Sequence, residues 1–162
     1  MEFKKIDIKF WRADIFLYFH SMIIRQAVSQ DSPLIKNLLI QLGYSNLSDE
    51  EINNKIKSYA QDGYHLLVAE VDYSVIAFLS LHWFDIFHSV GKIGRITAFC
   101  VDENFRSKQI GKQLLEASEK FLVQQGCTKI EVTSNIRRLR SHDFYLNRGY
   151  IEDSKRFTKY PT

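Results

Sequence analysis

Three apolar segments close together in the middle of the chain constrain its fold more than any other feature. Residues 64–71 and 74–84 are rich in Val, Leu, Ile and Phe, and only Asp72 and Tyr73 separate them, which predicts a β-hairpin. A third strand is predicted over residues 93–101. Alternation along it would place on one face Ile96, Ala98 and Cys100, and on the other Thr97, Phe99 and Val101. We therefore expect a sheet centred on residues 64–101.

Helical patterns precede this sheet. After a short strand predicted over residues 22–28, a Ser-Pro pair at residues 32–33 is typical of a helix start, with a capping hydroxyl before a proline. Gly43 is expected to end that helix. Ser48 and Glu51 then have the spacing of a capping box, which predicts a second helix reaching Tyr59.

A long helix is predicted after the sheet. Apolar residues recur at helical spacing from Ile110 to Leu122, and Gly126 breaks the pattern. The rest of the chain alternates between short elements, namely a strand over residues 129–133, a helix over 139–147, and closing strands at Tyr150 and over 157–160. Strands interleaved with helices after an early hairpin indicate an α/β or α+β fold with a mixed sheet.

Length and composition narrow the class of protein. With 162 residues, of which 45% are hydrophobic and 25% charged, the chain fits one globular domain. A net charge of +3 is too small to make nucleic acid or a membrane surface the expected partner, and no apolar run reaches the ~18 residues of a membrane helix. Cys100 and Cys127 lie in apolar segments, where reduced thiols are usual. We therefore expect a cytoplasmic protein.

Residues 1–21 stand apart from the domain expected over residues 22–162. They contain six aromatic residues among charged ones and lack the apolar core and cleavage site of a signal peptide. Met22 is the only other methionine and stands where the first strand begins, so one interpretation is an extension added by an upstream start codon. The alternative is an arm that packs on a neighbouring subunit of a homodimer, because aromatic side chains are costly to expose.

The polar loop before the long helix carries the first chemical signal. Arg106, Lys108 and Lys112 surround a helix N-terminus, where unpaired amides and the helix dipole favour an anion. Gly111 has no Cβ to block a phosphate. The pattern indicates a pyrophosphate site, and the alternative is an ordinary helix start with solvated basic side chains.

Two motifs resemble one family. Arg106-x-x-Gln109-x-Gly111 resembles the acyl-CoA pyrophosphate loop of the GNAT family of N-acetyltransferases, Arg/Gln-x-x-Gly-x-Gly/Ala, with Gln109 at the position of the middle glycine. Residues 134–150 resemble the C-terminal segment of small-molecule members, and residues 156–159 are similar to the ending of aminoalkylphosphonate N-acetyltransferases. The resemblance covers residues 22–160 by element order. It implies a mixed, mostly antiparallel sheet of six to seven strands flanked by about four helices.

The resemblance also implies acetyl-CoA as acyl donor. In the family the pantetheine arm lies along the middle strand, so we expect backbone groups of Phe99 and Val101 to bind it. The pyrophosphate would be held by Arg106, Ser107, Lys108, Gln109, Ile110, Gly111 and Lys112.

Three residues nearer the C-terminus match family positions. Tyr145 corresponds to the general acid that protonates the thiolate of coenzyme A, and it would also contact the cofactor. Asn135 and His142 are further candidates for cofactor contacts. The alternatives are a turn-forming Asn135, a structural His142 and a Tyr145 whose hydroxyl lies at the surface.

The general base departs from the family pattern. Deprotonating an amine of ordinary pKa at pH 7 costs roughly 4.6 kcal/mol, so a proton acceptor is needed. Many relatives use a strand carboxylate, but residues 95–98 contain no acid. His82, Asp85 and His88 are the candidate bases, with Asp102 and Glu103 less well placed, and solvated loop side chains are the alternative. Their spacing matches no preferred metal geometry, so no metal is expected.

We therefore expect an enzyme that transfers the acetyl group of acetyl-CoA to a primary amine of a small molecule by direct attack. Two alternatives stay open. One is a sensor that binds acyl-CoA without turnover, and the other is an acetyltransferase acting on protein N-termini or lysines.

Overall fold

The computed structural model describes residues 22–161, so the expectations for residues 1–21 lie outside the described part of the chain. The described chain divides into two compact units, the first ending at Val132 and the second beginning at Thr133. Within the described residues, no helix combines the length and the apolar character that crossing a membrane requires.

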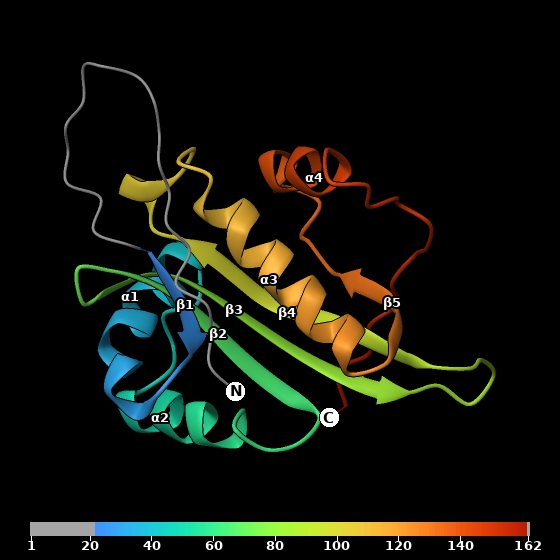
Figure 1. Cartoon of the computed structure of the whole chain (residues 1–162), viewed down its shortest axis with the longest axis horizontal. Helices are drawn as coiled ribbons and strands as arrows, with labels where there is room; N and C mark the ends of the chain where they lie inside the picture. Colours follow the sequence, from blue (N-terminus) through green and yellow to red (C-terminus); the bar gives the residue numbers. More distant parts are fainter. Residues whose placement is uncertain (1–21, 162) are drawn as a thin grey trace. The chain divides into compact units, whose positions relative to one another are not determined.

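The first unit is built on a sheet whose strands lie in sequence order (Figure 1). Its five strands are β1 (Ile23–Gln26), β2 (Tyr64–Val71), β3 (Ser74–Asp85), β4 (Lys92–Val101) and β5 (Cys127–Val132). The first three pairings are antiparallel and the pairing of β4 with β5 is parallel. The expected mixed, mostly antiparallel sheet is therefore confirmed. So is the hairpin, because Asp72 and Tyr73 both have the positive φ that a tight two-residue turn requires.

The expected number of strands is wrong for the described residues. The sheet has five strands rather than six or seven. Residues 150–161, which include the closing strands expected at Tyr150 and over 157–160, form no strand. A strand takes its hydrogen bonds from a neighbouring strand, so an apolar pattern alone does not produce one. The second unit contains one helix, α4 (Leu139–Leu146), close to the predicted 139–147.

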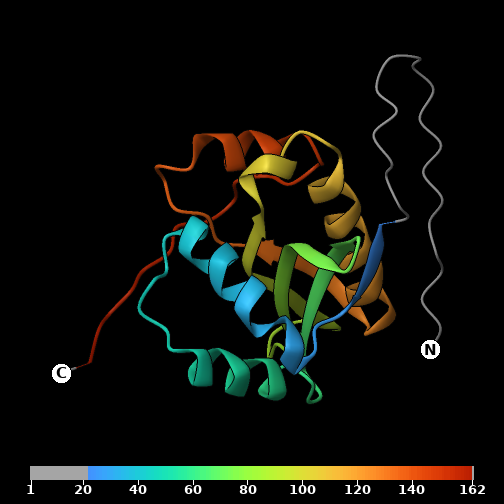
Figure 2. The same cartoon turned by 90° about the vertical axis from the view of Figure 1, so that its left-hand side faces the viewer.

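Two helices cover one face of the sheet (Figure 2). The first, α1 (Ser32–Leu42), ends at Gly43, which has a φ of 97° in the left-handed region. The second, α2 (Asp49–Ser58), begins with the expected capping box, since Ser48 N–H donates to Glu51 Oε2 at 2.7 Å and Glu51 N–H donates to Ser48 Oγ at 3.2 Å. The core between these helices and the sheet contains Ile35, Leu38, Ile52, Ile56, Leu66, Val68 and Phe78.

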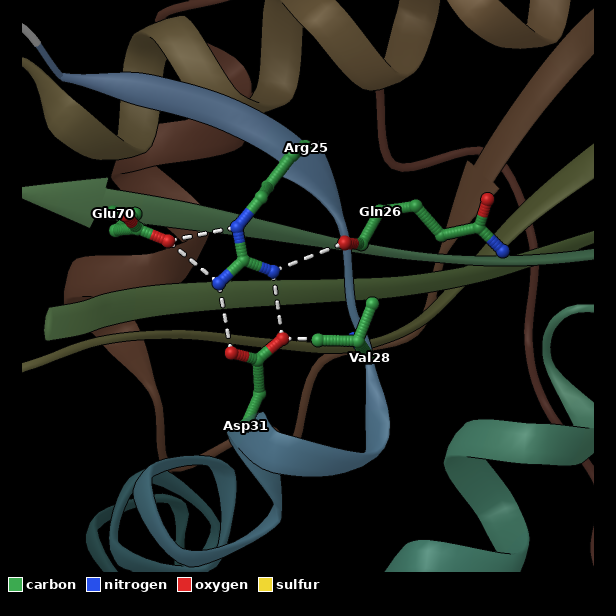
Figure 3. A network of polar contacts seen from close by, with 5 residues as sticks. All are labelled: Arg25, Gln26, Val28, Asp31 and Glu70. Atoms are coloured by element: carbon green, nitrogen blue, oxygen red, sulfur yellow. Dashed lines mark hydrogen bonds and ion pairs between the residues drawn. The ribbon is translucent and has the colours of Figure 1, made fainter. Parts of the chain in front are cut away.

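A buried ion pair occupies the start of α1 (Figure 3). The N-cap residue is Asp31 rather than Ser32. Asp31 is only 5% exposed. Its carboxylate accepts hydrogen bonds from two nitrogens of Arg25 at 2.7 and 2.8 Å and from Val28 N–H at 2.8 Å. Arg25 Nε also donates to Glu70 Oε2 at 2.7 Å. One guanidinium therefore joins β1 and β2 to the 3-10 turn η1 (Ser29–Asp31).

The third helix, α3 (Ile110–Gln124), covers the other face of the sheet (Figure 2). Leu114, Leu115 and Leu122 are buried against the strands. Gly94 permits this approach, because a Cβ there would lie 2.6 Å from both terminal carbons of Leu122. The long helix predicted from apolar spacing is confirmed, and Gly126 follows its end with a φ of 84°.

A β-bulge in β4 contradicts the expected alternation of its side chains. Strands β3 and β4 pair Ser80 with Ala98 and Leu81 with Ile96, so Thr97 is the extra residue of the bulge. Residues directly opposite each other share a face, which places Ala98 and Ile96 on opposite faces. The expected common face of Ile96 and Ala98 is therefore wrong, because one inserted residue reverses the alternation.

Candidate active site

The loop between β4 and α3 contains two non-glycine residues with a left-handed backbone. A 3-10 turn, η2 (Glu103–Phe105), follows β4. Ser107 and Gln109 then have φ of 62° and 65° in the left-handed region, which non-glycine residues seldom adopt. Gln109 therefore takes the conformation that the glycine of the pyrophosphate motif would favour. Its side chain does not cap α3, so it leaves the amides of the first turn open to another acceptor.

Two side chains hold this loop to the rest of the first unit. Gln41 of α1 donates from Nε2 to Asp102 Oδ2 at 2.9 Å and accepts from Glu103 N–H at 3.0 Å. The bond from Gln41 is the largest cause that lowers the pKa of the Asp102 carboxyl below its ordinary value. Arg106 Nε donates to the Val101 carbonyl at 3.0 Å, at the end of β4. These hydrogen bonds hold the loop against α1 and against the end of β4.

The basic residues predicted around this helix N-terminus are exposed. The Lys108 ammonium lies 5.0 Å from the centroid of the Phe105 ring, and Lys112 Nζ lies 3.8 Å from Glu116 Oε1. Arg106 is exposed apart from its bond to Val101. The seven predicted pyrophosphate-binding residues comprise the last four residues of this loop and the first three of α3, and we call this segment the turn at residues 106–112. Its role in binding stays a prediction.

The pairing of β4 with β5 ends several residues before this turn. The register of β4 with β5 ends at Ile96, opposite Val132. Phe99 and Val101, expected to bind the pantetheine arm, lie beyond that point and are paired with β3 on the other side. Their role in binding stays a prediction.

A cavity of about 260 Å³ opens between the helices α1 and α2 and the sheet. All of its lining residues belong to the first unit. Most of them are apolar, and Lys55 is the one charged side chain among those described. The full lining consists of Ile35, Leu39, Tyr44, Leu47, Ile52, Lys55, Ile56, Tyr59, Leu66, Phe78, Ser80, Thr97 and Ala98.

Three hydroxyl groups gather on the wall of this cavity at the β4 bulge. Ser80 Oγ and Thr97 Oγ1 lie 2.8 Å apart, and Tyr59 Oη lies 3.5 Å from Thr97 Oγ1. Thr97 Oγ1 also lies 3.3 Å from the Ser80 carbonyl, to which it donates. We call Tyr59, Ser80 and Thr97 the hydroxyl cluster.

The sequence analysis singled out none of these three as site residues. The available signal was one serine within the apolar residues 75–81 and one threonine within the apolar residues 96–101.

His82 lies in a row of side chains that crosses four strands. The register places Tyr64, His82, Arg95 and Glu131 side by side on β2, β3, β4 and β5. The His82 ring stacks on Tyr64 at 5.8 Å and on Phe84 at 5.2 Å. Arg95 donates to Glu131 Oε2 at 2.8 Å. Burial, helped by the charge of Arg95, lowers the pKa of His82 below its ordinary value, so His82 is a neutral imidazole at pH 7.

The candidate bases differ in their surroundings, and His88 is exposed in the β3–β4 loop. Asp85 is exposed at the end of β3, in register with Lys92. His82 is half-buried and reaches the cavity through a chain of rings, because Tyr64 also meets Tyr59 of the hydroxyl cluster at 5.3 Å. Neither residue belongs to the lining itself.

In the second unit, Asn135 and His142 contact each other. His142 Nε2 lies 3.0 Å from the Asn135 carbonyl oxygen, and Asn135 Oδ1 accepts from Arg137 N–H at 3.0 Å. Arg138 N–H also donates to the Asn135 carbonyl at 2.9 Å. Asn135 therefore forms the turn before α4, which is the turn-forming role given above as the alternative to a cofactor contact. A cofactor contact for either residue stays a prediction.

Tyr145 lies on α4 among other aromatic rings. Its ring centroid lies 5.3 Å from that of Phe144 and 5.4 Å from that of Tyr150. Burial raises the pKa of the Tyr145 phenol to about 12, against a smaller opposing effect of the Arg138 charge. The phenol is therefore protonated at neutral pH, as a proton donor must be.

Comparisons with known proteins agree on one family. The model of the acetyltransferase (GNAT) family matches residues 34–150. Aminoalkylphosphonate N-acetyltransferase of Salmonella typhimurium is 30% identical over 137 residues, which cover 84% of this chain and 89% of that protein. The crystal structure of glucosamine-6-phosphate N-acetyltransferase from Arabidopsis thaliana is similar with a TM-score of 0.76 and 26% identity, covering 87% of this chain and 99% of that chain.

An aminoglycoside N-acetyltransferase solved in complex with CoA shares the fold alone. Its TM-score is 0.77 at 20% identity, over 91% of this chain and 98% of that chain.

Proposed function

The chain belongs to the GNAT family of acetyltransferases, and we propose on that premise that it transfers the acetyl group of acetyl-CoA to a primary amine of a small molecule. One observation carries the choice of acceptor. The cavity of about 260 Å³ beside the middle of β4 is large enough for a small molecule and is walled by two helices. Its polar groups converge at Thr97, four residues before the end of β4, and at Ser80 on the neighbouring strand β3.

The donor side of the proposal rests on the turn at residues 106–112. Its open helix amides and exposed basic side chains suit the pyrophosphate of coenzyme A. Gln109 in the left-handed conformation supports this assignment despite its departure from the motif. Phe99 and Val101, beyond the end of the β4–β5 register, would bind the pantetheine arm. When bound, acetyl-CoA supplies a reactive thioester.

The chemistry requires the acceptor amine to be neutral. The amine nitrogen forms a bond to the acetyl carbon as the bond from that carbon to sulfur breaks. The amine proton leaves toward a base, and the sulfur receives a proton. We assign the second transfer to Tyr145, whose high pKa means that its proton moves late, as negative charge builds on sulfur.

We assign the first transfer to His82 in preference to Asp85. His82 is neutral at pH 7 and therefore able to accept a proton. Because it lies outside the cavity lining, it would act through water rather than by touching the amine. The exposed Asp85 carboxylate is the alternative base.

The experiment is an acceptor screen with acetyl-CoA and release of free thiol as the readout. The panel holds an aminoalkylphosphonate, glucosamine 6-phosphate, simple alkylamines, amino acids and a lysine-containing peptide. Amine-dependent thiol release with a small molecule supports the proposal. Binding of acetyl-CoA without thiol release would instead identify a sensor, and activity confined to the peptide would identify a protein acetyltransferase.

Two further expectations belong to the same proposal. Cys100 and Cys127 are buried and reduced, which is consistent with a reducing compartment and supports a cytoplasmic enzyme. A homodimer would be detected by native mass spectrometry of the full chain, which also reports any coenzyme A that copurifies.

A further inference from the structure

The cavity lining limits the chemistry of the acceptor, given the proposed function on which this inference rests. Among its described residues there is no carboxylate. A polyamine would bring a second ammonium group with no acidic partner in the cavity, next to the cation of Lys55. A sugar would bury several hydroxyl groups against side chains that offer few hydrogen bonds, which costs free energy for each one.

Most of the cavity lining is apolar, which favours binding of the hydrocarbon part of an acceptor. The aliphatic and aromatic side chains come from both helices, the loop between them and three strands: Ile35, Leu39, Leu47, Ile52, Ile56, Leu66, Phe78 and Ala98. Apolar area removed from water contributes roughly 25 cal/mol per Å², so a hydrocarbon body gains most from this surface. The cavity volume of about 260 Å³ suits a small acceptor.

The charge of Lys55 is available to a ligand. Glu51 lies one turn earlier on α2, but its carboxylate is held at the helix start, where Oε2 accepts from Ser48 N–H at 2.7 Å and from Ser48 Oγ at 2.8 Å. Lys55 has no ion-pair partner among residues 22–161. Lys55 lies one turn before Tyr59, the C-cap residue of α2, so the cation and one member of the hydroxyl cluster come from the same wall of the cavity.

We propose that the acceptor is a monoamine with a hydrocarbon body and one anionic group, bound with the anion at Lys55 and the amine at the hydroxyl cluster. Tyr59, Ser80 and Thr97 supply oxygen atoms that accept hydrogen bonds from the amine, and the apolar walls hold the hydrocarbon body. The anion is a carboxylate or a phosphonate, and both interact with an ammonium in the same way.

The test uses acceptors that share one hydrocarbon body. Phenethylamine has no acid, phenylalanine carries a carboxylate, and the corresponding aminophosphonate carries a phosphonate, while spermidine and glucosamine represent the excluded classes. For the wild-type protein we expect higher kcat/KM for the two anionic members than for phenethylamine, and the lowest values for spermidine and glucosamine. Comparing the carboxylate with the phosphonate identifies the acid.

A matched pair of variants isolates the charge. Lys55→Met removes the ammonium and keeps an unbranched stem, and Lys57→Met makes the same change on α2 at a residue outside the lining. Because Lys55 is exposed and water screens its charge, we expect Lys55→Met to lower kcat/KM about fivefold for the anionic acceptors and to leave phenethylamine unchanged. Lys57→Met should leave all acceptors unchanged.

Each result separates this inference from the proposed function. An equal effect of Lys55→Met on all members, or a preference for spermidine or glucosamine, overturns the inference while acetyl transfer itself stands. If acetyl-CoA binds and no amine releases thiol, the proposed function fails and the inference fails with it.

Discussion

Ser80 and Thr97 face each other across β3 and β4 with their hydroxyl oxygens 2.8 Å apart. Ser80 is buried, whereas Thr97 is exposed at the bulge. The bulge brings Thr97 and its neighbour Ala98 to the same cavity, although successive residues of a regular strand point to opposite faces. The wall of the candidate acceptor site therefore depends on a single inserted residue.

Removing the Thr97 hydroxyl should impair catalysis and spare the fold. Thr97→Val keeps the shape of the side chain and deletes one hydrogen-bonding group. We expect kcat/KM for the best acceptor to fall about tenfold, equivalent to ~1.4 kcal/mol for a lost hydrogen bond to the amine. Thr128→Val serves as control, because Thr128 is an exposed threonine of β5 outside the cavity. Equal activity of the two variants would contradict a role for the hydroxyl cluster.

Replacing Gln109 by glycine should be tolerated better than replacing it by a β-branched residue. Its left-handed backbone costs a residue with a Cβ about 1 kcal/mol, partly offset by the chain entropy that glycine loses. We expect Gln109→Gly to raise the free energy of unfolding by about 0.5 kcal/mol and Gln109→Val to lower it by about 1 kcal/mol. Denaturant unfolding measures both values. Calorimetry with acetyl-CoA should show that the glycine variant retains binding, and a loss of binding would mean that the Gln109 side chain itself holds the cofactor.

Breaking the pair of Arg25 and Asp31 should destabilise the first unit. In Arg25→Met the buried Asp31 carboxylate loses two hydrogen bonds and its counter-charge. Removing one partner of a buried pair leaves an uncompensated charge, so we expect a loss of about 3 kcal/mol in the free energy of unfolding. The double variant Arg25→Met with Asp31→Asn is the control, and it should recover part of the loss. If the double variant were less stable still, charge burial would not be the cause.

The same pair predicts a dependence of stability on pH. Burial raises the pKa of Asp31, but the bonds from Arg25 and from the Val28 amide outweigh it, so the pKa lies below its unfolded value. A carboxyl with a lowered pKa stabilises the fold fully above its unfolded pKa of ~3.9 and loses that contribution as the pH falls through the folded pKa. Acid unfolding of the wild type should therefore be steeper than that of the double variant.

Tyr145→Phe should lower kcat without adding a basic limb to the pH profile. General acids contribute ~100-fold or more, and the pKa of about 12 places Tyr145 at the low end of that range, so we expect a loss of about 100-fold. The phenol titrates far above neutrality, so Tyr145 should cause no loss of the wild-type rate below about pH 11. The pH profiles of the wild type and Tyr145→Phe should therefore have the same shape up to that pH. Titration of the phenolate absorbance in both proteins measures the pKa. A Tyr145 pKa near 10 would contradict the burial.

His82→Gln should abolish the acidic limb of the kcat/KM profile. The pKa of His82 lies below its ordinary value, so the wild-type limb should fall below pH 6.5 as the imidazole becomes protonated. The matched control is His88→Gln, an exposed histidine of the β3–β4 loop. If the limb persists in His82→Gln and disappears in Asp85→Asn, the base is Asp85.

Elements governed by neighbours in sequence were predicted well. The capping box of Ser48 and Glu51 and the tight turn at Asp72 and Tyr73 each involve residues at most three apart. The turn at residues 106–112 likewise combines a local backbone conformation with the N-terminus of the helix that follows it. Such features are visible in a sequence because the interacting groups are close along the chain.

Features that join distant segments were missed. Asp31 rather than Ser32 precedes α1 as its N-cap, because Arg25 binds Asp31 and also Glu70 on another strand. The closing strands expected within residues 150–161 did not form, because a strand depends on a partner that its own pattern does not specify.

By itself, the amino-acid sequence determined the order of the elements, the hairpin, the long helix and the basic turn at its start, since each follows from periodicity, caps and turn residues. Only the tertiary structure decided which side chains line the acceptor cavity. The bulge at Thr97 arises from the register between β3 and β4, and the cavity needs Lys55 and Tyr59 of α2 to lie over those strands. Register and helix packing depend on the whole core at once, and no local pattern encodes them.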